Sequence, residues 1–372
     1  MRVAWDARVV YHAELRGMGT YAANLVRAIG CARPSLDRIV LTDEPTPHLD
    51  RIPGLSPRIV GPSRGYRWGL WEQVGLPWHA TRLRADVLHS PANTAPLMGL
   101  VPRVVTVHDV IPYLPGVAPA PLSGRYWLHT VPGAIRAAAA VLTDSEASRR
   151  DIVRILDVPT ERITVVPLAV GSDVDVPTDA VVRSILAAHD VRQPYVLSLA
   201  APALRKNTMG VLRVFGRVAR RCADVQLVLT GVGPALRADV LAAADAHGVP
   251  VSRLRLLDYV DAESRNALYA GAAVFLFLTL YEGFGLPILE AMRCGAPVLC
   301  STRSSCPEVA GDAAVMVDPA DEAAAADALL AMLRASSSER AEWQARGRAR
   351  EREFTWARTA ELTLSVYDAV AN

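Results

Sequence analysis

Residues 272–295 read AAVFLFLTLYEGFGLPILEAMRCG. The apolar run Ala273–Leu278 is too short for a membrane helix and predicts a strand buried on both faces of a parallel sheet. The polar segment Tyr281–Gly285 follows it and, with two glycines, predicts a turn. Pro287 suits the first turn of a helix, where its missing N–H costs nothing, and that helix should end at Gly295. The segment is therefore expected to form a strand, a glycine turn and a helix.

A turn of this kind lies at the carboxyl end of a parallel strand. It directs backbone N–H groups and the positive end of a helix dipole toward a bound anion. Glu282 lies in the turn, and Glu290 lies eight positions later in the helix. Two carboxylates around such a site suit a ligand that carries both phosphate and hydroxyl groups. The simpler alternative is a tight turn with one solvated and one capping glutamate, and the spacing alone does not choose between them.

Length and composition narrow the class of protein. At 372 residues the chain exceeds what one hydrophobic core usually serves, which predicts two domains. Its 40 basic and 38 acidic residues give a net charge of +2, without the basic excess expected of a nucleic-acid binder. The five cysteines show no C-x-x-C and no paired histidine spacing, so we expect reduced, buried thiols and no zinc site. No apolar run of about 18 residues occurs, and a cytosolic protein is expected.

Predicted strands and helices alternate along the whole chain, which is typical of doubly wound parallel sheets. We therefore expect an α/β protein with two Rossmann-like domains that face a cleft. The looser stretch Ala169–Asp179 is the predicted linker. The expected domains are residues 1–175 and 176–354, followed by an amphipathic helix at 355–372. The predicted strands are Arg2–Trp5, Ile39–Asp43, Val87–Ser90, Val104–Asp109, Val141–Ser145, Ile163–Leu168, Tyr195–Leu199, Val225–Thr230, Leu254–Leu257, Ala273–Leu278, Pro297–Cys300 and Val315–Val317.

The loop before the first predicted helix contains two glycines. Gly17, Gly19 and Ala22 match a relaxed G-x-G-x-x-A dinucleotide fingerprint, and Asp43 lies near the distance expected for a ribose-binding acid. In a true fingerprint the first glycine follows the strand at once, whereas about ten residues intervene here. A loop that faces a ligand is the better interpretation.

His108 comes at the end of a predicted buried strand and should point into the crevice. With Asp109 it would form a general base and its orienting acid, although an acid directly after the histidine should face the opposite side of the strand. Ser145 at the end of another strand is a candidate helix cap.

The segment at residues 64–89 is rich in aromatic and basic side chains. Three interpretations stay open: it lies on a membrane surface, it holds an acceptor, or its tryptophans pack against the sheet, which is the more common case. The residues concerned are Arg64, Tyr66, Arg67, Trp68, Trp71, Trp78, Arg82 and Arg84.

Three polar groups follow predicted strands in the second half. Arg205-Lys206 suits a diphosphate, Gly231–Gly233 suggests a nest of backbone N–H groups, and Glu282 with Glu290 suits hydroxyl groups. This set favours a transferase with a nucleotide-linked donor over a dinucleotide-dependent oxidoreductase. A pure binding module is the third possibility, but it would not need this set of polar groups in the second half opposite His108 in the first.

Several motifs resemble the retaining GT-B glycosyltransferases of family 4, particularly bacterial mannosyltransferases. The resemblance spans nearly the whole chain, and the eight-residue spacing from Glu282 to Glu290 is its most specific part. The matching segments are Gly17–Tyr21, Trp71–Gln73, His108-Asp109, Ser145–Asp151, Arg205–Asn207, Leu280–Pro287 with Glu290, and Pro307–Asp312.

The resemblance implies transfer of a hexose with retention at the anomeric carbon, without a metal or other cofactor. Arg205 and Lys206 would neutralise the donor diphosphate, and Glu290 would bind the ribose. Glu282 and the backbone of Phe284 and Gly285 would hold the donor sugar. Gly17 and Gly19 would border the acceptor or the phosphate. His108, as a neutral imidazole near pH 7, would donate a hydrogen bond to the sugar. The last helix would cross back to the first domain. The implied catalytic residues are His108, Glu282, Arg205 and Lys206, and the implied donor-binding residues are Gly17, Gly19, Arg205, Lys206, Gly231, Tyr259, Val260, Glu282, Gly283, Phe284, Gly285, Leu286 and Glu290.

Departures from the family pattern leave the donor nucleotide open. Ala200, Ala169 and Asp258 stand where relatives often have glycine, and Leu278 and Thr279 stand where proline and serine are common. GDP-mannose is the first expectation and a UDP- or dTDP-sugar the second. The acceptor would be a glycan, a lipid-linked saccharide or a natural product. Residues 64–84 are a possible contact with the inner face of a membrane. The alternative function is that of a nucleotide-sugar epimerase of the same fold.

Overall fold

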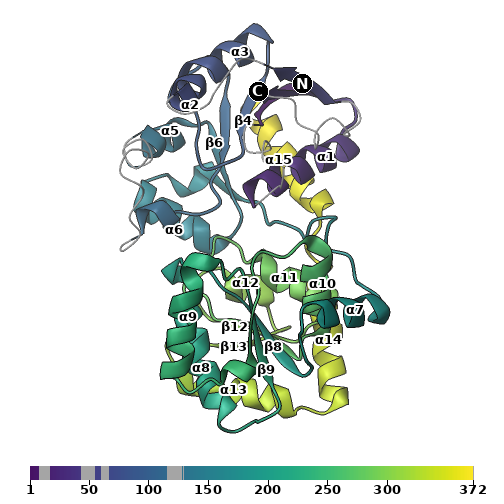
Figure 1. Cartoon of the computed structure of the whole chain (residues 1–372). Coiled ribbons are helices and arrows are strands. Elements are labelled where there is room, and N and C mark those ends of the chain that lie inside the picture. The colour runs from purple at the N-terminus through teal and green to yellow at the C-terminus, as the bar shows by residue number, and fades with distance from the viewer. Residues whose placement is uncertain (8–16, 43–54, 60–66, 115–127, 129, 372) are drawn as a thin grey trace. The chain divides into compact units, whose positions relative to one another are not determined.

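Figure 1 shows the computed structural model of the chain, which describes all residues except 8–16, 43–54, 60–66, 115–127, 129 and 372. The chain divides into two compact units. The first comprises Met1–Leu168 and Thr355–Asn372, and the second comprises Ala169–Phe354. Each unit is built on one parallel β-sheet with helices, so the expected α/β class with two Rossmann-like domains is confirmed.

The sheet of the first unit has seven strands within the described residues, all pairing in parallel in the order β3-β2-β1-β4-β5-β6-β7. The strands β4 and β6 are buried along their whole length, as expected for strands covered on both faces. The strands are β1 (Arg2–Asp6), β2 (Asp37–Thr42), β3 (Leu55–Ile59), β4 (Val87–Ser90), β5 (Arg103–Thr106), β6 (Ala140–Thr143) and β7 (Ile163–Val165). The helices are α1 (Met18–Ala32), α2 (Arg67–Leu70), the π-helix η2 (Trp71–Gly75), α3 (Leu76–Arg82), α5 (Val131–Ala137), α6 (Glu146–Leu156) and α15 (Trp356–Ala371), with the 3-10 turns η3 (Ile111–Tyr113) and η5 (Thr160–Arg162).

The sheet of the second unit has six parallel strands in the order β10-β9-β8-β11-β12-β13. Its core joins the strands to α8, α9 and α13. The strands are β8 (Tyr195–Leu199), β9 (Gln226–Thr230), β10 (Leu254–Leu256), β11 (Val274–Phe277), β12 (Val298–Ser301) and β13 (Val315–Val317). The helices are α7 (Asp179–Ala188), α8 (Thr208–Ala219), α9 (Pro234–Ala246), α10 (Ala262–Gly271), α11 (Leu286–Cys294), α12 (Cys306–Ala310), α13 (Glu322–Arg334) and α14 (Ser337–Glu351), with the 3-10 turns η6 (Leu204–Lys206) and η7 (Val251–Arg253).

The predicted strand, glycine turn and helix at residues 272–295 are confirmed as β11, the turn and α11. All four residues of β11 are buried. Gly285 precedes the helix at φ +108° and Gly295 follows it at φ +85°. Both values lie in the left-handed region, where a side chain would strain the backbone, so glycine is the fitting residue at each end of α11.

The strand orders place a switch point in each sheet. Strands β8, β9 and β10 run toward one edge of the second sheet, and β11, β12 and β13 run toward the other. The order of the first sheet reverses in the same way between β1 and β4. Crevices at the carboxyl ends of two such neighbouring strands are the usual ligand sites of open α/β sheets.

The division of the chain differs from the expected boundary at residue 175. Residues 169–175 belong to the second unit because α10 and α11 hold their backbone. Asn266 Nδ2 donates to the carbonyl oxygen of Asp173 at 2.9 Å, and Arg293 Nη1 donates to that of Gly171 at 3.2 Å. Arg265 also pairs with the Asp173 carboxylate at 2.9 Å. A composition shift could not reveal these contacts.

The C-terminal helix α15 packs on the first unit, as expected, and a buried polar network holds it there (Figure 1). The hydroxyl of Tyr367 lies 2.6 Å from His89 Nδ1 and accepts from Trp5 Nε1 at 3.0 Å. His89 Nε2 lies 2.8 Å from the hydroxyl of Thr106. Burial lowers the pKa of His89 to about 3, so the ring is neutral and can accept one hydrogen bond and donate another.

Replacing Tyr367 with phenylalanine is expected to destabilise the first unit by about 1–3 kcal/mol, because it leaves a buried hydrogen-bond network incomplete. Urea unfolding followed by tryptophan fluorescence would measure this change. Ser365→Ala, which removes an exposed hydroxyl from the same helix, should stay within about 0.5 kcal/mol of the unmodified protein. Equal effects of the two substitutions would contradict the proposed role of the network.

Two further observations bear on the expectations from sequence. Among the described residues, no helix combines the length and the apolar character needed to cross a membrane. All five cysteines are free thiols, but Cys31 is exposed and Cys222 is half-buried, so the expectation of uniformly buried thiols is wrong for these two. Asp43, Arg64 and Tyr66 lie outside the described residues.

Candidate active site

Two cations and one carboxylate meet at the switch point of the second sheet. Arg205 and Lys206 lie in η6, directly after β8, and Glu282 lies in the turn after β11. Because β8 and β11 are neighbouring parallel strands, their carboxyl ends lie at one edge of the sheet. Arg205 Nη1 lies 3.1 Å from Glu282 Oε2, and Lys206 Nζ lies 2.8 Å from Glu282 Oε1.

The backbone around this cluster is tied together by hydrogen bonds. The carbonyl oxygen of Arg205 accepts from the N–H of Leu280 at 2.7 Å and lies 2.8 Å from the hydroxyl of Thr279. That hydroxyl also lies 2.9 Å from Glu282 Oε1. Asn207 Nδ2 donates to the carbonyl of Leu278 at 2.9 Å. The backbone carbonyl of Leu278 and the hydroxyl of Thr279 thus help to position the cluster.

The charges of the cluster suit an anion. Two cations and one carboxylate leave a formal charge of +1 where β8 and β11 end. Lys206 is the only lysine in a chain whose 39 other basic residues are arginines. Its side chain is mostly buried, and its ammonium lies 5.2 Å from the ring centroid of Phe277. An incoming diphosphate would meet partly desolvated cations, which bind more strongly than exposed ones.

Glu290 lies in α11, about one helical turn after the glycine turn. The hydroxyl of Tyr269 donates to Glu290 Oε2 at 3.2 Å. Burial raises the pKa of Glu290, and the nearby Arg265 opposes this rise. Arg265 is in turn paired with Asp173. Glu290 is thus held by neighbours in a fixed position, as a ribose-binding acid would be.

The turn before α11 is partly buried. Phe284 packs edge to face on Phe354, with ring centroids 5.7 Å apart. The hydroxyls of Ser304 and Ser305 donate to the carbonyl of Glu282 at 2.6 and 3.0 Å. Gly283, Gly285 and Leu286 complete the turn and begin the helix at the edge where Arg205 and Lys206 lie.

The predicted backbone nest at Gly231–Gly233 is wrong for its first two N–H groups. The N–H of Gly231 donates to the carbonyl of Asp258 at 3.2 Å, and that of Val232 donates to the carbonyl of Leu257 at 2.9 Å. These bonds continue the pairing of β9 with β10 and leave neither group free for an anion. Gly231 has φ +82°, and an added Cβ would lie 2.6 Å from the carbonyl oxygen of Ala200. Close backbone packing and the left-handed φ therefore explain why position 231 is a glycine.

Tyr259 and Val260 follow β10 at the same edge of the sheet. Tyr259 is 64% exposed, and Val260 is half-buried. Because β10 is two strands away from β8, these residues lie farther from Lys206 than Glu282 does. Their position fits the rim of a site whose centre is the cluster at β8 and β11.

In the first unit His108 is paired with an acid that the sequence did not single out. His108 Nδ1 lies 2.7 Å from Asp144 Oδ2, and Nε2 lies 3.0 Å from the carbonyl oxygen of Pro91. The neighbouring Asp109 instead accepts from the backbone N–H of Ile111 at 2.9 Å. The pairing arises because β4, β5 and β6 are adjacent, so that Pro91, His108 and Asp144 follow three neighbouring strands.

The surroundings of His108 favour the charged ring. Burial lowers its pKa, but the charge and hydrogen bond of Asp144 and the Pro91 carbonyl outweigh burial, and the net pKa is raised. A carbonyl can only accept, so Nε2 carries a proton, and Nδ1 shares a second one with Asp144. Both ring nitrogens thus face acceptors in this structure, and Nε2, which was expected to donate to a sugar, lies against the carbonyl of Pro91. Asp144 Oδ1 and the Ser90 hydroxyl are both buried without a partner among the described residues.

The glycines Gly17 and Gly19 begin α1. Gly17 has φ +41° with no atom within 4 Å of an added Cβ, and Gly19 is buried in the first helical turn. Ser145 caps α6 as predicted, accepting from the N–H of Ser148 at 3.0 Å. Gly17, Gly19 and His108 belong to the first unit, whereas the cluster belongs to the second.

Known proteins match this chain over both units. A model for family 4 glycosyltransferases matches residues 15–174, and a model for group 1 glycosyl transferases matches residues 193–335. A D-inositol 3-phosphate glycosyltransferase of Xylanimonas cellulosilytica is 30% identical over 94% of this chain and 91% of its own length. The chain belongs to glycosyltransferase family 4. Both models describe glycosyltransferases and give the epimerase alternative no support.

Other relatives of this family 4 chain include mannosyltransferases. The O-antigen chain mannosyltransferase B of Escherichia coli is 34% identical over 249 residues, which are 65% of this chain and 64% of that protein. The chain thus spans less than two thirds of this relative. Among solved structures, Anabaena HepE in complex with UDP-glucose shares the fold, with a TM-score of 0.73, 14% identity and coverage of 99% of this chain and all of that one.

Replacing Glu290 with glutamine should weaken binding of the donor's nucleoside diphosphate about tenfold, because a charged hydrogen-bond acceptor for hydroxyl groups is lost. Isothermal titration with GDP and UDP would measure the affinity. Glu263→Gln changes an exposed glutamate of α10 and serves as the matched control. An unchanged affinity of the Glu290 variant would contradict its assignment to the nucleotide.

Proposed function

We propose that this family 4 protein transfers a hexose from a nucleoside-diphosphate sugar to an acceptor hydroxyl, with retention of the anomeric configuration. The observation that carries the proposal is the cluster of Arg205, Lys206 and Glu282 at the switch point of the second sheet. A site of this kind supplies positive charge where the leaving diphosphate gains negative charge.

In the proposed reaction the bond between the anomeric carbon and the diphosphate oxygen breaks while the acceptor oxygen bonds to the same face of that carbon. The acceptor's proton passes to the departing phosphate oxygen. Arg205 and Lys206 form ion pairs with Glu282 in the structure and would turn from it to the diphosphate as the donor binds. Glu282 and Thr279 would then be free to accept and donate hydrogen bonds to sugar hydroxyls.

The donor is proposed to be GDP-mannose, with a UDP- or dTDP-sugar as the second choice. The mannosyltransferases among the relatives support mannose. Incubation with a panel of nucleotide sugars and a simple glycoside acceptor, with the anomeric configuration of the product read by NMR, tests the proposal. Release of nucleoside diphosphate that depends on the acceptor is expected, with an α-product from an α-donor. An inverted product would contradict retention.

No metal ion is proposed in the reaction, because Arg205 and Lys206 stand where a cation would serve the diphosphate. The Asp-x-Asp pair Asp173-Val174-Asp175 is committed elsewhere, with Asp173 bound to Arg265. Activity should therefore persist, within about twofold, in excess EDTA. Initial rates with EDTA, and with added Mg²⁺ or Mn²⁺, would check this. Complete loss in EDTA that either cation restores would overturn the assignment of the diphosphate site.

The acceptor is proposed to be a saccharide, free or lipid-linked, or a natural product, met in the cytoplasm. A lipid-linked acceptor would place the protein at the inner face of the membrane, with residues 64–84 in contact with it. Trp71 in that segment packs against the sheet, as the third interpretation expected, whereas Trp78 is exposed.

A further inference from the structure

One face of the first unit exposes large apolar side chains that the proposed chemistry does not use. Leu70, Val74 and Trp78 follow one another at four-residue spacing along α2, η2 and α3. Their exposed fractions are 65%, 57% and 54%. Trp71 and Leu76 of the same helical segment are buried. The segment thus has an apolar stripe on its exposed side as well as on its buried one, where an ordinary surface helix would be polar on the exposed side.

The loop before β5 continues this apolar stripe. Met98 and Leu100 are 78% and 88% exposed. Gln73 of η2 holds the loop by a donated bond of 3.2 Å and an accepted bond of 2.8 Å to its backbone. Gly99 lies against α3, because an added Cβ would be 3.1 Å from Pro77 Cβ. We call Leu70, Val74, Trp78, Met98 and Leu100 the apolar face.

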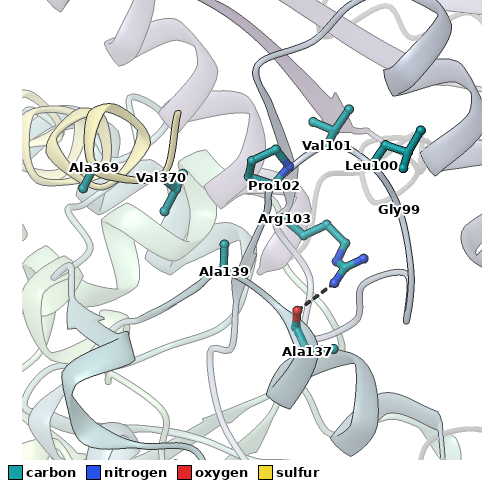
Figure 2. A pocket seen from close by; sticks show the side chains of 9 residues that line it. All are labelled: Gly99, Leu100, Val101, Pro102, Arg103, Ala137, Ala139, Ala369 and Val370. Carbon is teal, nitrogen blue, oxygen red and sulfur yellow. Dashed lines mark hydrogen bonds between the residues drawn. The ribbon is translucent and has the colours of Figure 1, made fainter. Parts of the chain in front are cut away.

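A cavity of about 460 Å³ opens beside Leu100, as Figure 2 shows. The loop at residues 99–103, Ala137, Ala139 and the last turn of α15 line it. Arg103 reaches into this lining and donates to the carbonyl of Ala137 at 2.7 Å. Within the described part of the chain the Arg103 Nε is buried without a hydrogen-bond partner, and burial lowers the pKa of this guanidinium. Apart from Arg103, the residues that line the cavity are small or apolar.

The rim of the apolar face is basic. The guanidinium of Arg82 lies 5.3 Å from the ring centroid of Trp78, and Arg84 is exposed two residues later. The one acid of the helical segment, Glu72, is buried and bonded to Thr94, away from the face. The nearby Asp86 accepts from the backbone N–H of Arg2 at 2.7 Å.

We propose that the apolar face docks on an anionic lipid surface. Its five side chains would lie at the boundary of the acyl chains, and Arg82 and Arg84 would lie at the phosphates. Apolar side chains with a basic rim match the layering of a bilayer, which is apolar below an anionic head-group layer. Tryptophan with an arginine on its ring suits that boundary. The proposal rests on the proposed function in that it would bring a lipid-linked acceptor to the enzyme.

Co-sedimentation with vesicles tests the proposal without any turnover. The full chain should bind vesicles of phosphatidylcholine with phosphatidylglycerol, and bind them less in high salt. Trp78→Ser and Leu100→Ser should each reduce the partition coefficient about tenfold, because each removes most of one large apolar side chain from the boundary. Val74→Ser should also weaken vesicle binding. Its matched control is Val251→Ser, the same change at the 68% exposed valine of η7, and this control should bind vesicles as the unmodified protein does.

The outcomes separate the alternatives. Transfer to a soluble acceptor should be unchanged in Trp78→Ser. This result would show that the variant is folded, and it would distinguish a failure of docking from a failure of the proposed reaction. Vesicle binding that is absent, or equal in Trp78→Ser and the unmodified protein, overturns the proposal. Concentration-dependent self-association that Trp78→Ser abolishes, without vesicle binding, would assign the face to a second copy of the chain instead.

Discussion

Turnover is expected to fall by about 10²–10³-fold when Lys206 is replaced by alanine, the usual effect of removing one group that stabilises developing negative charge. Lys206 lies 2.8 Å from Glu282 and is mostly buried, so water cannot replace its charge at the diphosphate. Stopped assays of transfer at saturating donor would measure the loss. Affinity for the free nucleoside should change little, because the nucleoside carries no diphosphate.

Lys206→Arg is the informative companion variant. It keeps the charge but places a wider, planar group against Phe277, where the lysine ammonium lies 5.2 Å from the ring. We expect it to recover only part of the lost turnover. Arg217→Ala, at a partly exposed arginine of α8, is the control for loss of one positive charge. Equal turnover of Lys206→Ala and this control would contradict the role of Lys206.

A chemical-modification experiment would test the same assignment independently of turnover. Because Lys206 is the only lysine, an amine-acylating reagent can modify only its side chain and the N-terminal amine. Bound nucleoside diphosphate should protect Lys206, and intact mass with peptide mapping would show which amine is protected. Protection of neither site would place the diphosphate elsewhere.

Asp144→Asn is expected to have the second largest effect, because it leaves His108 buried without its counter-charge. Removing one partner of a buried ion pair costs about 3–5 kcal/mol. With Asp144 gone, burial alone acts on the ring, and the pKa of His108 should fall below its ordinary value. Chemical denaturation gives the stability, and NMR titration of labelled histidines gives the pKa. If the charged ring contacts the donor, turnover should fall together with the pKa of His108.

The pH dependence follows from the direction of the shift. The raised pKa of His108 means that its contribution to stability is complete below pH 6.5 and is lost as pH rises through the raised value. The groups that face this ring in the first unit are Asp144, Asp109, His89 and Tyr21. In Asp144→Asn the loss of stability at rising pH should disappear, because burial then lowers the pKa of His108 below its ordinary value instead of leaving it raised.

Asp109→Asn is the matched control, because Asp109 follows His108 in sequence but bonds to the N–H of Ile111. It should leave the titration of His108 nearly unchanged. The double variant His108→Gln, Asp144→Asn should recover part of the stability lost in Asp144→Asn, because neither charge is then buried alone. A larger shift from Asp109→Asn than from Asp144→Asn would contradict the pairing.

Elements with a strong local pattern were predictable. The apolar run and flanking glycines of β11 and α11 are local signals, because a buried strand, a left-handed glycine and a helix start each depend on a few adjacent residues. Elements with weak patterns were not predicted. The strand β3 is five residues long, contains Pro57 and lies at the edge of its sheet, where proline is tolerated.

The sequence by itself determined which side chains end each strand, and hence that Arg205, Lys206, Glu282 and His108 would lie at carboxyl edges. Which of them meet was decided by strand order. The strand order reverses between β8 and β11, so these two strands are neighbours, and this brings Lys206 to Glu282 across 76 positions of sequence. The same ordering joins His108 to Asp144 in place of Asp109 and occupies the N–H of Gly231 with the carbonyl of Asp258. Pairing between strands depends on contacts distant in sequence, which the residues flanking each strand do not encode.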